Sequence, residues 1–504
     1  MTNAKNLMGT KPILPLLVSM SVPSILSMLI QSLYNVVDSI FVAWLSNDAL
    51  TAVSLAYPLQ NLVLAVAVGF GVGINAYIAR NLGEGNQHRV DQAASMGVIF
   101  TTIHAVIFIL VGLFGSEPFL HMFTNDPEIL QMSVNYTRIV ICLSFGSLYH
   151  IFIEKLFQAV GNMVVPMILQ GVGAIVNIIL DPILIFGMFG LPAMGVTGAA
   201  VATVTGQMTA CGLAVFCFLR TRTGIRITRK DMKIDAGIAK RIYAVGVPSG
   251  LMTAMPSLLV SILNALLVGL HTLAVAAFGL YFKLQTFVYM PGNGLIQGMR
   301  PIVSYNYGAG QGRRLHLVIR WSLALTAIIM ALGTLIAWGV PRQIMGLFDA
   351  DEAMIAVGVP MLRITSLGFL VSTLGTVMAG CFEALGKGLY SLSISLLRQL
   401  LVIPPLAMVF SLSWGLNGVW AAFPVAEALA ALVAVLLYRK VMRQTDRQLQ
   451  NSEVDCAGGN TQAAAIPDSI ILVLAVQNKL LKPACGRSFS QAAMATTQKV
   501  PNSA

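Results

Sequence analysis

Apolar residues occur in long continuous blocks along most of the chain, from residue 13 to residue 440, with short polar segments between them. Each block holds about 20 predominantly apolar residues, which is the length that a helix needs to cross the hydrocarbon core of a bilayer. The strands of a membrane barrel would give shorter segments in which apolar and polar positions alternate. The pattern therefore predicts an integral membrane protein of the all-α class.

The blocks predict twelve transmembrane helices. We expect them at roughly residues 13–45, 50–79, 92–114, 129–154, 163–187, 193–219, 241–269, 274–299, 317–339, 354–381, 388–411 and 416–438. The first block is too long for a secretory signal peptide and no small-residue cleavage site follows it, so we expect no cleaved leader. Residues 441–504 are mostly polar, and we expect a disordered cytoplasmic tail there. A small segment on the lipid surface, at the short apolar patch 470–476, is the alternative.

The charges in the connecting loops predict how the helices are oriented. Alternate loops hold an excess of basic residues, namely Arg80, Arg89, Lys155, Arg300, Arg313, Arg314, Lys387 and the runs at 220–241 and 439–447. The loops between them hold acidic residues, namely Asp48, Glu117, Asp126, Glu128, Asp349, Asp351 and Glu352, with Arg342 as a single exception. Because cytoplasmic loops carry the excess of Lys and Arg, we expect both termini and the 220–240 loop in the cytoplasm. The expected location is a bacterial cytoplasmic membrane.

Composition agrees with this picture and excludes other classes of protein. Among the 504 residues, 57% are hydrophobic and 10% are charged, whereas a soluble domain carries about 25% charged residues. The net charge of +11 lies in basic loops that face anionic lipid, so it does not require a nucleic acid partner. The six cysteines have no metal-binding spacing, and neither a P-loop nor an HExxH motif occurs. We therefore expect a protein that is not an enzyme and has no cofactor other than a coupling ion.

The two halves of the chain repeat each other at a fixed offset of 225 residues. The matched pairs include Pro23 and Pro248, Gln60 and Gln285, Gly69 and Gly294, Gly73 and Gly298, Gly85 and Gly310, Asp126 and Asp351, and Gly161 and Gly386. Later the offset becomes 220, so that Gly195 matches Gly415 and Gly198 matches Gly418. A register that holds without gaps over about 140 residues is not chance.

Each half contains six predicted helices, so both halves begin on the same side of the membrane. We expect two pseudo-symmetric lobes, at 1–219 and 241–440, joined by a basic linker at 220–240 and followed by the tail at 441–504. Parallel repeats related by an axis along the membrane normal are known in transporters, which bind substrate between the repeats. A channel, receptor or scaffold could also arise by duplication, but alternating access fits two lobes in one chain better.

Ionisable residues inside a span are costly and indicate function. Asp38 and Asp181 lie at similar depth, each about six residues from the outer end of its helix. Asn177 precedes Asp181 by four residues, so both side chains lie on one face of the helix. Two carboxylates and an amide can share a proton or supply oxygen ligands to Na⁺. We therefore predict an ion-coupling site for H⁺ or Na⁺ in the first lobe, with H⁺ favoured.

The duplicated lobe lacks this pair of acids. The position equivalent to Asp38 is Leu263, and apolar residues at 403–405 stand near the counterpart of Asp181. The candidate residues for a substrate cavity are Lys283, Gln60, Gln285 and Glu427. Lys283 and Glu427 both lie in the second lobe, where they could pair. The acids of the first lobe favour cationic drugs as substrates.

The sequence resembles the multidrug and toxic compound extrusion (MATE) family over residues 13–440. The segments that carry the resemblance are VPS at 22–24, Asp38, ARNLGEG at 79–85, FQAVGN at 157–162, NIILDP at 177–182 and GVTGAAVAT at 195–203, with second-half copies such as 301–310. Each motif is short, but their joint order and spacing are specific.

The resemblance implies two six-helix lobes around a central cavity, with efflux of drugs or organic cations driven by inward H⁺ or Na⁺. It places the ion site at Asp38, Asn177 and Asp181, and adds Thr203 to it. Some members carry acids in the seventh and tenth helices, whereas here the seventh has none and the tenth has only Glu383 at its cytoplasmic end, which argues against a cation site in the second lobe. A flippase of lipid-linked precursors in the same broader superfamily is the alternative, and it would need a more cationic central cavity. A monomer that contacts drugs and membrane lipid is expected.

Overall fold

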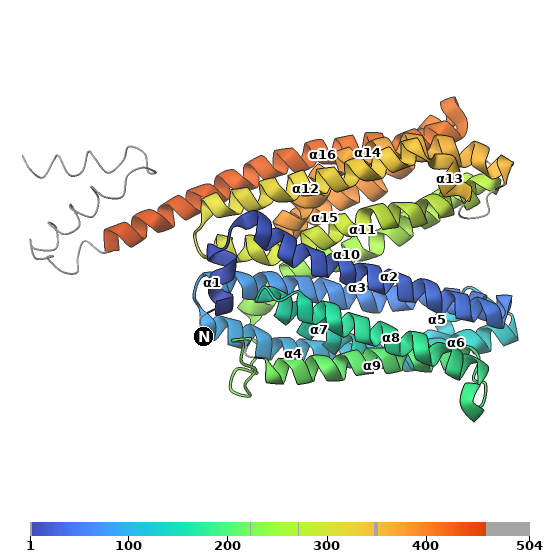
Figure 1. The fold of residues 1–504 in the computed structure, drawn as a ribbon, viewed down its shortest axis with the longest axis horizontal. Helices are drawn as coiled ribbons and strands as arrows, with labels where there is room; N and C mark the ends of the chain where they lie inside the picture. Colours follow the sequence, from blue (N-terminus) through green and yellow to red (C-terminus); the bar gives the residue numbers. More distant parts are fainter. Residues whose placement is uncertain (1–2, 222, 271, 347–350, 460–504) are drawn as a thin grey trace, which may run out of the picture. The chain divides into compact units, whose positions relative to one another are not determined.

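The computed structural model describes residues 3–221, 223–270, 272–346 and 351–459. Within these ranges the chain is helical and contains no strand, which confirms the predicted all-α class (Figure 1). The described residues up to Leu449 form one compact unit, and residues 450–459 belong to a second. All of the candidate site residues lie in the first unit.

The helices of the first half follow each other in a single bundle. They are α1 (Asn3–Thr10), α2 (Ile13–Leu45), α3 (Asn47–Gly83), α4 (Gln87–Leu110), the π-helix η1 (Val111–Gly115), α5 (Ser116–Leu120), α6 (Pro127–Cys142), α7 (Phe145–Ala159), α8 (Val164–Phe186), the 3₁₀ helix η2 (Met188–Gly190) and α9 (Val196–Arg220).

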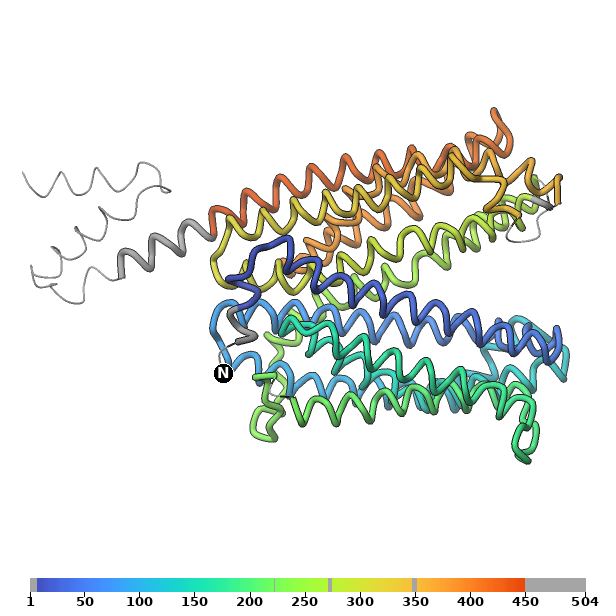
Figure 2. Tube along the Cα trace, viewed as in Figure 1, coloured from blue at the N-terminus to red at the C-terminus, as the bar shows by residue number. Residues whose placement is uncertain are grey.

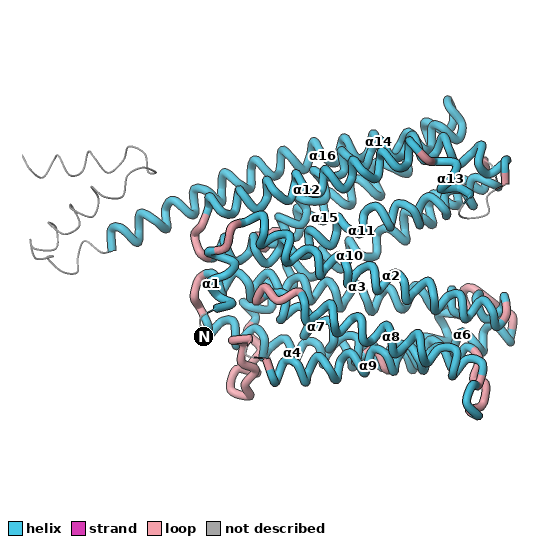
Figure 3. The backbone as a smooth tube through the Cα atoms, viewed as in Figure 1, coloured by secondary structure: helices cyan, strands magenta, loops and turns pink. Residues whose placement is uncertain are grey.

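The second half repeats this arrangement. It contains α10 (Ala236–Val268), α11 (Thr272–Gly308), α12 (Gly312–Gly339), α13 (Pro341–Gly346), α14 (Glu352–Ala384), α15 (Gly388–Leu396), the π-helix η3 (Leu397–Val402) and α16 (Ile403–Gly459). Figure 3 shows that the loops between these helices lie mostly at the two ends of the bundle.

Twelve spans can be assigned within the described residues, as predicted. Nine stretches of helix are long and apolar enough to cross a membrane, and α6 with α7, which are bent by 41° at their junction, make a tenth. The helix α11, with 37 residues, is long enough to be a further span, although it is less apolar than these. One of the nine stretches, Gly388–Gln448, holds two spans, because Gly415 breaks it with a φ of 54° and a ψ of −136°.

The helices differ from the prediction mainly in length. Several extend farther than expected at the end of the bundle where α1 lies. For example, α11 was expected to end near residue 299, but it continues to Gly308. The final helix α16 continues to Gly459, so residues 441–459 are helical where we expected a disordered tail. Residues 460–504 lie outside the described residues. Hydropathy reports only the apolar part of a helix, and it misses the polar turns that extend beyond the membrane.

The internal repeat is visible in the backbone conformation. Glycines with positive φ occur in matched pairs, namely Gly85 and Gly310 (73° and 71°), Gly161 and Gly386 (84° and 78°), and Gly195 and Gly415 (54° and 54°). Residues with a Cβ atom rarely adopt this left-handed region, so these turns require glycine. The same turn chemistry at both offsets of the sequence repeat confirms two copies of one fold.

Small residues bring the two lobes together in the half of the helices nearer to α1. A Cβ atom at Gly69 in α3 would lie 2.5 Å from the carbonyl oxygen of Gly246 in α10. A Cβ atom at Gly294 in α11 would lie 2.6 Å from the Cγ1 atom of Ile25 in α2. Figure 2 shows the two lobes close together at this end of the molecule and farther apart at the other.

Candidate functional site

The predicted ion site is assembled from α2 and α8, which pack against each other in the first lobe. On α8, the Nδ2 atom of Asn177 donates a hydrogen bond of 3.3 Å to Oδ1 of Asp181, one helical turn away. Both side chains are almost completely buried. One face of α8 is buried in the lobe and carries Asn177 and Asp181, whereas Ile175 and Ile179 on its other face are exposed.

Asp38 on α2 completes the pair of acids, because its carboxyl group lies within hydrogen-bonding reach of the Asp181 carboxyl group. An ionised carboxylate only accepts hydrogen bonds, so such a contact requires a proton on one of the two groups. Three buried oxygens of the site, Asp38 Oδ1, Asn177 Oδ1 and Asp181 Oδ2, have no hydrogen-bond partner among the described residues. The site therefore offers acceptors to a proton or a small cation.

Two tyrosines belong to this site, and the sequence analysis missed both. Tyr34 and Tyr136 interact electrostatically with Asp38 and Asp181. Tyr34 precedes Asp38 by one helical turn, and this spacing was visible in the sequence. Tyr136 comes from α6, and its OH accepts a hydrogen bond of 3.1 Å from Nε2 of Gln60. Nothing in the sequence links α6 to α2, so only the fold reveals Tyr136.

The predicted residues Gln60 and Thr203 both lie in the first lobe, but only Gln60 is linked to the acid pair by a hydrogen-bonded side chain. Gln60 of α3 lies near the ion site, because its Nε2 atom donates a hydrogen bond to the OH of Tyr136. Thr203 lies on α9 one turn before Gly206, which packs against the Cβ atom of Asn177. Among the described residues, no hydrogen bond links Thr203 to either acid. The described part of the chain holds no cluster of three His, Cys, Asp or Glu side chains suited to a metal.

Glu427 in the second lobe pairs with Arg398, so the expected pairing with Lys283 is wrong. The Nη1 atom of Arg398 lies 3.1 Å from Oε1 and 3.4 Å from Oε2 of Glu427. Glu427 is buried, and Tyr289 also hydrogen-bonds it. Arg398 lies in η3, and such π-helical turns are frequent at functional sites. Gln285 joins this cluster through its hydrogen bond with Tyr289.

Lys283 is exposed and lies on the side of α11 that faces the first lobe. It precedes Gly294 by eleven residues, which is close to three full turns, so both occupy one face of the helix. Gly294 packs against Ile25 of α2. Phe287, one turn beyond Lys283, is 50% exposed on the same face. Lys283 therefore remains a candidate for contact with substrate between the lobes.

A buried charged cluster connects α7 of the first lobe to α11 of the second. Lys155 Nζ lies 3.1 Å from Glu154 Oε1, and the same oxygen accepts hydrogen bonds from Gln158 and, across the lobes, from Gln297 of α11. Glu154 and Lys155 are only 9% and 7% exposed. The assignment of Lys155 to a basic loop was therefore wrong, because this residue lies inside α7.

Comparison with protein families supports the repeat. The family model MatE matches residues 23–183 and, separately, residues 248–408. The two matches are displaced by the same offset that relates the two halves of the sequence. Each lobe is therefore one copy of the family's conserved unit.

Curated relatives of similar sequence are multidrug export proteins. The multidrug export protein MepA of Staphylococcus saprophyticus is 27% identical over 418 residues, covering 83% of this chain and 91% of that protein. MepA of Staphylococcus aureus strain N315 is 27% identical over 429 residues, covering 84% of this chain and 93% of that protein.

Solved structures with the same fold extend the comparison. A transporter of the MOP superfamily from Pyrococcus furiosus, described as having a binding pocket of reverse polarity, has a TM-score of 0.83 and 24% identity, covering 88% of this chain and 99% of that chain. A multidrug resistance MATE transporter in an outward-facing conformation has a TM-score of 0.84 and 24% identity, covering 89% and 99%. At this identity, the likeness establishes a shared fold.

Proposed function

The chain belongs to the MATE family of multidrug efflux transporters, and on this basis we propose that it is a secondary active antiporter that exports cationic drugs in exchange for H⁺. The observation that carries the proposal is the contact between the carboxyl groups of Asp38 and Asp181. Two buried carboxylates in contact repel each other, and binding one proton relieves the repulsion. The site can therefore exist in two states that differ by one proton.

Coupling follows if the proton and the drug are linked through this site. A cationic drug between the lobes is stabilised by ionised acids and is released more readily when they are protonated. By thermodynamic linkage, protonation then weakens drug binding by the same factor by which the drug weakens protonation. Uptake of H⁺ from outside would thus release the drug there, and a pH gradient would drive export.

The decisive experiment is transport in proteoliposomes under an imposed pH gradient or an imposed Na⁺ gradient. Asp38→Asn and Asp181→Asn should each abolish efflux of ethidium driven by a pH gradient, because the nearly isosteric amide cannot carry the proton. The control is Asp48→Asn, which changes an exposed acid of the first lobe and should transport like the parent. If both site variants transport normally, the coupling site lies elsewhere. If only a Na⁺ gradient drives efflux, Na⁺ replaces H⁺ in the proposal.

A flippase of lipid-linked precursors is the second candidate, because Lys283 gives the face between the lobes a positive charge. Such precursors carry anionic phosphates, which a lysine binds. Expression in a pump-deficient bacterium separates the two functions. Lower ethidium accumulation supports drug export, whereas unchanged accumulation across a panel of cationic and neutral drugs supports the flippase.

We also propose that the transporter works as a monomer in the cytoplasmic membrane with both termini in the cytoplasm. Tyr307 of α11 hydrogen-bonds Gln448 near the end of the first unit, while the neighbouring Asn306 bonds the Met8 carbonyl of α1. The beginning and the end of this unit therefore lie at the same end of the bundle, as an even number of spans requires. A reporter fused after Arg447 should be active only in the cytoplasm.

A further inference from the structure

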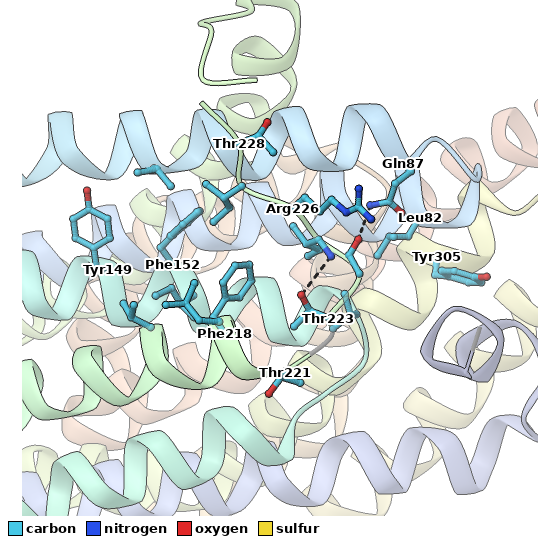
Figure 4. A pocket seen from close by; sticks show the side chains of 18 of the residues that line it. Leu82, Gln87, Tyr149, Phe152, Phe218, Thr221, Thr223, Arg226, Thr228 and Tyr305 are labelled. Atoms are coloured by element: carbon cyan, nitrogen blue, oxygen red, sulfur yellow. Dashed lines mark hydrogen bonds between the residues drawn. The ribbon is translucent and has the colours of Figure 1, made fainter. Parts of the chain in front are cut away.

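A cavity of about 1150 Å³ lies in the first lobe, away from the acid pair. Its walls come from α4, α7, α9 and the linker that follows Arg220, and Figure 4 shows its side chains. The volume slightly exceeds the range of about 300–1,000 Å³ that is usual for drug-sized ligands. The cavity can therefore hold a molecule longer than a typical drug.

One side of the cavity is apolar and faces the membrane. Phe152 of α7 and Phe218 of α9 lie along this side (Figure 4). Val215 and Leu219, on the last two turns of α9, also line it, and they are 41% and 78% exposed. Because exposed apolar residues near the end of a span contact lipid, this side of the cavity is continuous with the bilayer.

The other side is polar and carries positive charge. Arg226 and Thr223 of the linker line it together with Gln87 of α4 (Figure 4). Arg226 is exposed, and among the described residues its guanidinium group has no hydrogen-bond or ion-pair partner. Asp91 Oδ1 accepts the backbone N–H of Arg226 and the side-chain amide of Gln87, and no ion pair joins Asp91 to the guanidinium group among the described residues.

The linker is held against α4, so the polar side is part of the fold. Gln87 Nε2 donates a hydrogen bond of 2.7 Å to the carbonyl oxygen of Gly224. The backbone N–H of Thr228 donates one of 3.0 Å to Oγ of Ser95. Ile225 of the linker is itself buried, with 6% exposure, in the apolar core of the first lobe. The residues that face the cavity are thereby positioned before any ligand binds.

We propose that this cavity binds one anionic phospholipid, with an acyl chain along the aromatic side and the headgroup phosphate at Arg226 and Thr223. The charge of the polar side selects an anionic headgroup, and basic pockets at the cytoplasmic ends of spans are suited to such headgroups. The opening to the bilayer selects a lipid over a soluble anion. Tyr305 of α11 also lines the cavity, so the bound lipid contacts both lobes.

Native mass spectrometry of the purified full chain, titrated with phosphatidylglycerol or phosphatidylcholine, tests the proposal. The parent should bind one phosphatidylglycerol in preference to phosphatidylcholine. Arg226→Gln should lower the apparent affinity for phosphatidylglycerol by about fivefold, because one basic residue near an anionic lipid contributes that much. Arg229→Gln, which changes an exposed linker residue outside the cavity, should bind like the parent.

A second pair of variants tests the apolar side. Val215→Trp should fill the cavity and reduce binding of both lipids, whereas Val106→Trp changes an exposed residue of α4 outside the cavity and should not. The proposal fails if Arg226→Gln and Val215→Trp bind phosphatidylglycerol like their controls. It also fails if inorganic phosphate alone competes with the lipid, because the cavity is then an anion site. Drug transport is not measured, so these outcomes are independent of the antiporter proposal.

Discussion

At the scale of single residues, the Glu154–Lys155 pair shows how a membrane protein keeps charge inside a lobe. Glu154 Oε1 accepts hydrogen bonds from Lys155, Gln158 and Gln297, and this satisfies the buried carboxylate. A buried ion pair is tolerated only when both partners remain, because an unpaired charge pays its full desolvation cost. The pair is a structural element of the contact between the lobes.

We therefore predict that Glu154→Gln lowers the free energy of unfolding by about 3–5 kcal/mol, because it leaves the Lys155 ammonium buried without a carboxylate. Thermal unfolding of the purified protein in detergent measures this change. Adding Lys155→Met to Glu154→Gln should recover most of the loss, because no buried charge then remains.

The matched control for this prediction is Glu117→Gln. Glu117 pairs with Arg138 at 2.7 Å, but both side chains are about half exposed, at 51% and 43%. An exposed pair contributes about 0–1 kcal/mol, so this variant should unfold almost like the parent. Equal losses from the two glutamate substitutions would contradict the assignment of Glu154 to a buried pair.

The candidate site shows what single residues reveal before a structure exists. Asp38, Asn177 and Asp181 could be selected because charged and amide groups inside apolar blocks are rare. The partner of Glu427 could not be identified from the sequence. Lys283 and Arg398 are both basic residues inside apolar blocks, and only the packing of η3 shows that Arg398 is the partner. Tyr136 could not be identified either, because aromatic residues in a span usually serve in packing and the sequence gives no sign of a role beside the acids.

At the scale of elements, helix existence was predictable and helix ends were less so. The α2 helix begins at Ile13 and ends at Leu45 as expected, because Pro12 and Ser46 border a sharply defined apolar block. By contrast, α4 begins at Gln87, five residues before the prediction, because Asn86 caps a polar first turn. An N-cap with a polar turn outside the membrane leaves no trace in hydropathy.

The contact between α3 and α10 depends on glycine. A Cβ atom at Gly73 would collide with the carbonyl oxygen of Ile242, and this atom belongs to rigid helix backbone. Gly73→Ala should therefore push the two helices apart and destabilise the protein by about 1–3 kcal/mol, as overpacking does. The midpoint of thermal unfolding should fall accordingly.

Gly212→Ala in α9 is the matched control, because nothing lies within 4 Å of the position that its Cβ would occupy. Alanine stabilises a helix interior by up to about 1 kcal/mol relative to glycine, so this variant should be unchanged or slightly more stable. If Gly73→Ala behaves in the same way as Gly212→Ala, close packing does not hold α3 against α10.

At the scale of the whole molecule, the sequence repeat predicted two lobes, but it did not predict which surfaces hold them together. The offset of 225 residues pairs equivalent positions, whereas the contacts between the lobes join positions that are not equivalent, such as Glu154 and Gln297. The lobes meet in the half nearer to α1, and side chains toward the other end, such as Leu33 and Leu258, are 62% and 53% exposed. This arrangement corresponds to one state of a transporter that opens alternately on two sides.

Export requires the contacts between the lobes to separate, and Asn61 and Ser257, which lie near the midpoints of α3 and α10, provide a place to prevent it. Asn61 Nδ2 on α3 donates a hydrogen bond of 3.3 Å to Ser257 Oγ on α10, and both side chains are accessible. We predict that Asn61→Cys with Ser257→Cys, joined by a short thiol-specific cross-linker that a reductant cleaves, abolishes ethidium efflux from proteoliposomes. The parent for this experiment lacks the six native cysteines. Treatment with reductant should restore transport, because the lobes can then separate again.

Each single cysteine variant, treated with the same reagent, should keep its activity and thereby exclude an effect of the modification alone. Full transport by the cross-linked protein, with the link verified by mass spectrometry, would show that α3 and α10 stay together during the cycle and that the lobes do not move as two bodies.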